Sequence, residues 1–146
     1  MVDRERVARL LDRVAADLQK LARYGQSRQD PVDERWLDAV KYTFVTAIEG
    51  CGRVAHHLVV SQGWPIAESN ADAIRELAVQ GVVPGPVAEP VATAVGLRNV
   101  LVHQYAEVDD DRVVAALDRL SDLERFVAEV ADWLERGPGS PSEPGR

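Results

Sequence analysis

Hydrophobic residues recur every three or four positions along most of the chain, which is the spacing that predicts amphipathic helices. A first helix is predicted over about residues 3–24, ended by Gly25, and its apolar stripe is Val7, Leu10, Leu11, Val14, Leu18 and Leu21. A second helix is predicted to begin at Asp30-Pro31, with the aspartate as N-cap. Its inner face is Trp36, Val40, Phe44, Ala47, Ile48, Cys51, Val54, Ala55, Leu58 and Val59.

The second predicted helix is long and carries two glycines. It runs for about thirty residues before Gly63-Trp64-Pro65 closes it. Gly50 and Gly52 lie midway. They predict either a bend or a close crossing with another helix.

Three further helices are predicted after this one. Asn70 is expected to cap a short helix that runs through Gln80. A fourth helix should start near Pro86 or Pro90 and end around Gln104. The turn Val108-Asp109-Asp110 then leads into a fifth helix, whose inner stripe is Val113, Leu117, Leu120, Leu123, Phe126, Val127, Val130 and Leu134.

These elements predict an all-α fold, an antiparallel bundle of about four to five helices. The 146 residues suit one domain, which we place at residues 1–136. No strand-like alternation or internal repeat interrupts the pattern. Residues 137–146 are rich in Gly, Pro and Ser and are predicted to form a disordered tail.

Charge and cysteine content narrow the class of function. The formal net charge of −7 argues against a protein that coats nucleic acid, although it permits a local basic site. A single cysteine allows no intramolecular disulfide. There is no apolar signal core at the N-terminus and no run of ~18 apolar residues. We therefore expect a cytoplasmic protein with no membrane contact.

The most informative stretch is Gly96-Leu97-Arg98-Asn99-Val100-Leu101-Val102-His103-Gln104-Tyr105 in the fourth helix. With Arg98 at zero on a helical wheel, Asn99 falls near about 100°, His103 near about 140° and Tyr105 near about 340°. The polar residues thus share a broad face, while Leu97, Val100 and Leu101 would dock into the bundle. Val95 and Val102 fall on the polar face as well, which is expected of side chains at an interface. Asn99 and His103 are four apart, so the amide is expected to orient the imidazole.

An arginine near a histidine suits phosphodiester chemistry. Histidine titrates near neutrality and can take a proton from a ribose 2′-hydroxyl or give one to a leaving oxygen. Arginine can hold the phosphate and stabilise the developing charge. This scheme requires no metal or other cofactor. On spacing alone, however, such a pair is more often part of a solvated helix face.

The segment Arg98–Tyr105 resembles the signature of HepT-like proteins in the HEPN superfamily: Arg, a polar residue, three more residues, His, any residue, then Tyr. The resemblance implies a homodimeric helical bundle with metal-independent endoribonuclease activity. It also implies a toxin of a type II/VII-like toxin–antitoxin pair, whose antitoxin is a minimal nucleotidyltransferase. Arg98 and His103 would then be catalytic, Asn99 supporting, and Tyr105 the acceptor of AMP. RNA, not DNA, would be the substrate.

Other candidate residues have simpler interpretations. We expect one histidine of His56-His57 to be buried or at an interface and the other exposed, because neighbours on a helix point about 100° apart. Cys51 is predicted to be a small core residue. Asp109, Asp110 and Asp111 are expected to cap the last helix, a metal cluster being the weaker alternative.

Two rival functions stay open from the sequence. One is a non-catalytic HEPN partner of a nucleotidyltransferase, and the other is a nucleotide-binding module in which Arg98 grips a phosphate without cleavage. Retention of both Arg98 and His103 favours the ribonuclease. Incubation of the purified protein with RNA, with and without EDTA, distinguishes these possibilities.

Overall fold

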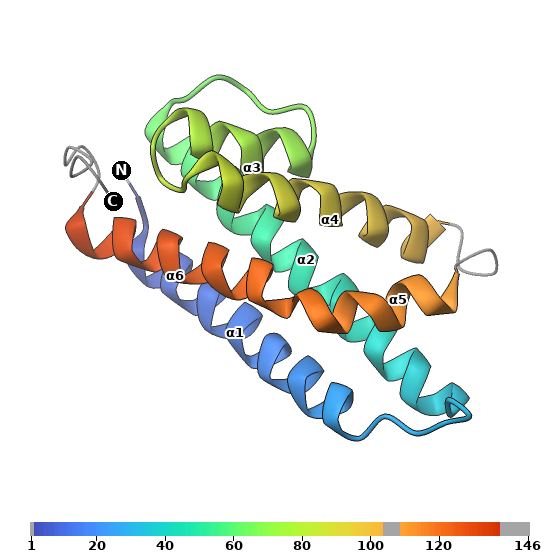
Figure 1. Ribbon diagram of the computed structural model, residues 1–146. Coiled ribbons are helices and arrows are strands. Elements are labelled where there is room, and N and C mark those ends of the chain that lie inside the picture. The colour runs from blue at the N-terminus through green and yellow to red at the C-terminus, as the bar shows by residue number, and fades with distance from the viewer. Residues whose placement is uncertain (1, 104–108, 138–146) are drawn as a thin grey trace.

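The computed structural model describes residues 2–103 and 109–137, whose secondary-structure elements are all helices joined by short connections, with no strand (Figure 1). The elements are α1 (Arg4–Gln26), α2 (Glu34–Gln62), α3 (Asn70–Val79), α4 (Gly85–His103), α5 (Asp110–Ala116), the 3-10 turn η2 (Leu117–Arg119) and α6 (Leu120–Arg136). Helices α1 and α6 lie side by side, α2 packs against α1, α3 and α4, and α4 also packs against α6. The predicted all-α bundle is confirmed for the described residues.

Side-chain caps fix where the first three helices begin. Asp3 accepts a hydrogen bond from the Arg6 amide at 3.0 Å and starts α1 as expected. The predicted start of α2 at Asp30-Pro31 is wrong, because Asp33 accepts from the Arg35 and Trp36 amides at 2.7 and 3.3 Å and is the N-cap. Asn70 is likewise not the cap of α3.

The α3 cap is Ser69, whose hydroxyl accepts from the Asp72 amide at 3.1 Å. Helix α4 begins at Gly85, slightly before the prediction, and keeps Pro90 inside it. The Pro84 carbonyl accepts from the Val87 and Ala88 amides, both at 3.0 Å, and so completes its first turn. Pro86 lies in this first turn, where proline is tolerated because the amides have no intrahelical partner. Pro90 lies beyond it and has no N–H to donate to the Pro86 carbonyl.

The predicted single last helix is instead α5, η2 and α6. Its apolar residues Leu117, Leu120, Leu123 and Phe126 recur every three positions. An interval of three residues is the period of a 3-10 helix, so the 3-10 turn η2 keeps these side chains facing the core. Phe126 is completely buried.

Small residues let the helices cross closely along α2. A Cβ placed at Gly50 would lie 2.5 Å from Val14 Cγ2 of α1, and one at Gly52 would lie 2.7 Å from the Asn70 side chain at the start of α3. Of the two interpretations of these glycines, the close crossing is therefore correct. The absence of both side chains sets how near α1 and α3 approach α2.

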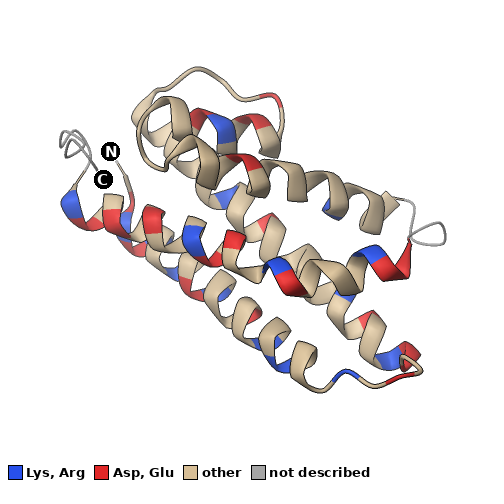
Figure 2. Cartoon of the chain, viewed as in Figure 1, with Lys and Arg blue, Asp and Glu red and all other residues tan. Residues whose placement is uncertain are grey.

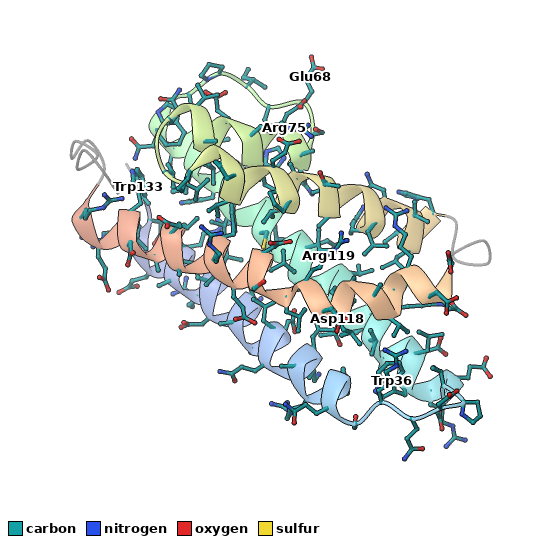
Figure 3. All side chains as sticks on the ribbon, viewed as in Figure 1. Trp36, Glu68, Arg75, Asp118, Arg119 and Trp133 are labelled. Carbon is teal, nitrogen blue, oxygen red and sulfur yellow. The ribbon has the colours of Figure 1, made fainter. Side chains whose placement is uncertain are left out.

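Polar contacts join segments that are distant in sequence. Lys41 on α2 is buried and pairs with Asp110 at the start of α5, Nζ to Oδ1, at 2.9 Å. At the other end of the bundle, Arg4 donates from Nη2 to the Leu134 carbonyl at 2.8 Å. The rings of Trp64 and Trp133 meet edge to face there, with centroids 6.1 Å apart, and Figure 3 places Trp133 near the C-terminal end of α6.

Charged residues are distributed unevenly over the helices. Figure 2 shows acidic and basic residues distributed along α1 and α6, whereas α4 carries few charged residues. Its charged residues are Glu89, which pairs with Arg75 of α3 at 3.0 Å, and Arg98. No helix in the described part of the chain is both long and apolar enough to span a bilayer.

The glycine crossing predicts a stability difference between two matched substitutions. Gly96→Ala in α4 has open space around its new methyl group and should raise the free energy of unfolding by about 0.5–1 kcal/mol through helix propensity. Gly50→Ala gains the same propensity but must displace Val14, an overpacking cost of about 1–3 kcal/mol. Urea unfolding should therefore find Gly50→Ala less stable than Gly96→Ala by that cost. Equal stabilities would contradict the close crossing.

Candidate functional site

The C-terminal half of α4 carries the predicted motif on a helix anchored by its other side. Leu97 and Leu101 are buried, as the sequence predicted, and Val100 is half-buried. Helix α3 is short and is tied to the N-terminal half of α4 by the Arg75–Glu89 pair. Figure 1 shows α4 extending beyond it. The motif residues therefore lie on a stretch of α4 that α3 leaves uncovered.

Arg98 points from α4 to α2 and is held there by Glu49. Arg98 Nε donates to Glu49 Oε1 at 3.0 Å, and Arg98 Nη2 donates to the same oxygen in a shorter contact. The two side chains keep only 22% and 29% of their exposure, so water screens this pair less than a surface pair. A planar guanidinium gripped through two nitrogens is fixed in orientation as well as in position.

Asn99 supports the arginine rather than the histidine. Its Oδ1 accepts from Arg98 Nη1 at 3.1 Å. No hydrogen bond joins Asn99 to His103 within the described residues, so the predicted orientation of the imidazole by this amide is wrong. Glu49 and Asn99 together take three of the five N–H groups of Arg98 and leave one on each terminal nitrogen to donate to a phosphate.

His103 lies exposed in the last turn of α4. It is five residues after Arg98, or about 7.5 Å along the helix axis, and forms no hydrogen bond with it among the described residues. Gly96 leaves open space on this part of the helix. The site in one chain is thus a fixed arginine and an accessible histidine on the same helix.

Val95 and Val102 are expected on the same face of α4 as the motif, but the structure places them in different environments. Val102 is 44% exposed and remains on that face, but Val95 is buried at 5%. The expectation that Val95 lies at an interface is wrong, because its side chain is buried in the hydrophobic core of the chain itself. Tyr105 lies outside the described residues.

The other candidates carry no comparable arrangement. His56 and His57 are both half-buried, which corrects the expected division into one buried and one exposed residue. Burial lowers the pKa of His57, as does nearby Arg6, against an opposing effect of Asp3. Its Nε2 is buried and has no hydrogen-bond partner among the described residues.

Cys51 and the acidic turn are structural, as predicted. Cys51 is buried in the core, and desolvation raises the pKa of its thiol to about 12. Asp109 caps α5 by accepting from the Asp111 amide at 3.0 Å, and Asp110 pairs with Lys41. Among the described residues, no group of three or more His, Cys, Asp or Glu side chains could hold a metal ion.

Glu49 is the site residue that sequence reasoning missed. It lies 49 positions from Arg98, and helical periodicity says nothing about which residues of two helices face each other. The available indication is weak: a lone carboxylate next to Ile48 and Gly50, inside a long apolar stretch of α2. Its pairing with Arg98 depends on how α4 packs against α2.

Comparison with known proteins identifies the family. The model of the family described as ribonuclease HepT-like matches residues 9–130, and the chain belongs to this family. It is 31% identical over 105 residues to the mRNA nuclease HepT of Shewanella oneidensis, covering 71% of this chain and 79% of that protein. It is 28% identical over 131 residues to a putative RNase of Archaeoglobus fulgidus, with coverage of 88% and 95%.

Solved structures share the bundle. A tri-AMPylated Shewanella oneidensis HEPN toxin in complex with an MNT antitoxin superposes with a TM-score of 0.81 at 25% identity, covering 91% of this chain and all of that one. The Bacillus subtilis cytosolic protein YutE, of unknown function, has the same fold, with a TM-score of 0.82 at 20% identity and coverage of 97% and 96%. The fold is therefore that of HEPN toxins.

Proposed function

We propose that this chain is a metal-independent endoribonuclease in which Arg98 and His103 act on one RNA phosphodiester. The observation that carries the proposal is the fixed guanidinium of Arg98 on the same helix as an accessible imidazole. Membership in a ribonuclease family supports it. The relatives named mRNA nuclease and putative RNase point to the same substrate class.

The chemistry proposed is intramolecular attack by a ribose 2′-oxygen. The 2′-hydroxyl loses its proton, its oxygen forms a bond to the adjacent phosphorus, and the bond from phosphorus to the 5′-oxygen breaks. The 5′-oxygen leaves with a proton, and the other product is a 2′,3′-cyclic phosphate. His103 takes or gives one of these protons. Arg98 stabilises the charge that accumulates on the non-bridging oxygens.

Glu49 and Asn99 are positioning residues in this scheme. They accept from three N–H groups of the guanidinium and leave one on each terminal nitrogen for the phosphate. An arginine already fixed in this way loses little conformational freedom when substrate binds. Neither residue needs to touch RNA.

We further propose that the chain is the toxin of a toxin–antitoxin pair and that a minimal nucleotidyltransferase neutralises it. The support is the related toxin found tri-AMPylated and in complex with an MNT antitoxin. Tyr105 is the proposed AMP acceptor because only one residue separates it from His103. A phosphodiester attached there would compete with RNA for Arg98 and fill the site.

The proposed active form is a two-fold homodimer with the α4 helices near the axis. One arginine and one histidine per chain is a small catalytic set, and an isologous contact brings the same patch of two chains together. Exposed Val102 beside His103 is an apolar side chain that such a contact would cover.

His103→Ala should slow RNA cleavage by about 10²–10⁴-fold, because it removes an acid–base group, and should leave the fold intact because the side chain is exposed. The matched control is His56→Ala, a histidine of α2 outside the site. Cleavage by the purified proteins, repeated with EDTA, and growth arrest on expression provide the readouts. Wild-type activity in His103→Ala would refute the assignment, and an inactive wild type would favour a non-catalytic partner or nucleotide-binding module.

Light scattering of the purified protein at micromolar concentration should give the mass of a dimer. Val102→Glu should shift the population toward monomer, since two buried carboxylates would face each other near the axis. A monomeric wild type would count against the composite site.

Co-expression with the partner nucleotidyltransferase should add AMP to the wild type and abolish its activity. Tyr105→Phe should gain no AMP and stay toxic, whereas Tyr42→Phe, which alters an exposed tyrosine of α2, should be modified normally. Intact-mass measurement and growth assays provide the readouts. If Tyr105→Phe were neutralised as well as wild type, inhibition would occur by binding alone.

A further inference from the structure

A groove of about 420 Å³ lies between α1 and α2 on the side of α2 that carries Glu49. Helix α2 contributes Tyr42, Thr46, Glu49, Gly50 and Arg53 to it, and α1 contributes Leu10, Arg13, Val14, Ala16 and Asp17. Gly50 has no side chain, so α1 approaches α2 closely at this position, which forms part of the floor of the groove.

The groove and the candidate site share one residue. Glu49 lines the groove and also holds Arg98. A strand whose scissile phosphate is bound by Arg98 would therefore lie next to the groove at Glu49.

The balance of charge in the groove is positive, which favours an anionic occupant. Glu49 is neutralised by its pair with Arg98, whereas Asp17 Oδ2 accepts from the neutral Thr46 hydroxyl at 2.7 Å and keeps its charge, so two arginines face one uncompensated carboxylate. Arg13 and Arg53 are exposed and form no ion pair with another described residue. In a chain of net charge −7, two uncommitted arginines beside a candidate phosphate site are notable.

Tyr42 adds an aromatic surface at the edge of the groove. Its side chain is 70% exposed, although most large hydrophobic residues of α2 are buried. Aromatic rings next to basic side chains are the usual combination for single-stranded nucleic acid, because every base can stack while arginines follow the backbone.

We propose that the α1–α2 groove is a second RNA-binding subsite, which holds the single strand beside the scissile phosphate. Arg13 and Arg53 contact neighbouring phosphates, and Tyr42 stacks on a base. The subsite rests on the proposed ribonuclease function, and it makes cleavage efficient on strands long enough to reach the groove. A dinucleotide, which ends at the catalytic residues, gains nothing from it.

The test compares the Arg13→Ala/Arg53→Ala double variant with wild type on a single-stranded RNA oligonucleotide and on a dinucleotide. For the oligonucleotide, KM should rise by about tenfold with kcat nearly unchanged, because the lost contacts are equally strong in the ground and transition states. Dinucleotide cleavage should not change. The slope of log affinity against log salt should fall by about 1.4, at roughly 0.7 for each lost phosphate contact.

The matched control is Arg119→Ala/Arg125→Ala, which removes the same charge from two exposed residues that do not line the α1–α2 groove. Figure 3 places Arg119 at the α5–α6 junction. Tyr42→Ala should also weaken oligonucleotide binding, and Tyr42→Phe should not. Unchanged oligonucleotide affinity in the Arg13→Ala/Arg53→Ala variant, or a loss equal to that of the control, would overturn the subsite.

Fluorescence anisotropy in a His103→Ala background separates this proposal from the proposed function. Binding needs no cleavage, so the Arg13 and Arg53 effect on affinity should persist there. If wild type never cleaves RNA but its binding still depends on these arginines, the ribonuclease proposal fails and the subsite stands. If wild type cleaves RNA but its affinity for RNA does not depend on Arg13 and Arg53, only the subsite proposal fails.

Discussion

The ion pair between Arg98 and Glu49 is the interaction on which the rest of the site depends. It joins two helices that meet only through the tertiary fold, and it turns a flexible cation on a helix surface into a donor of fixed direction. Asn99 completes the arrangement from the same helix. Without Glu49, the arginine would be one more exposed side chain on an acidic protein, as helical spacing alone suggests.

Packing explains why this pair can form and stay accessible. Close crossing at Gly50 and Gly52 draws α1 and α3 onto α2, and the buried Leu97 and Leu101 seat α4 on the bundle. Because α3 is short, the outer side of α4 is open where the motif lies. The same crossing at Gly50 shapes the α1–α2 groove, so a feature that stabilises the bundle also forms the proposed subsite next to the residue that holds Arg98.

Local pattern predicted the fold well and the site only in part. Helical periodicity and the motif located the helices and placed Arg98 and His103 on α4. The start of α2 was misplaced because Asp30 and Asp33 are equally good caps by residue type, and only the observed hydrogen bonds distinguish them. Val95 was misjudged because an isolated helical wheel does not show which neighbours cross over it. Glu49 could not be predicted, since its role depends on how α4 lies across α2.

The most direct test of this account is a double-mutant cycle on the rate of RNA cleavage by wild type, Glu49→Gln, Arg98→Ala and the combined variant. Glu49→Gln keeps the shape of the side chain but removes the charge that fixes Arg98, so kcat should fall by about tenfold or more. The combined variant should be no slower than Arg98→Ala alone, because Glu49 acts only through Arg98. Losses that multiply in the combined variant, or wild-type kcat in Glu49→Gln, would contradict the account.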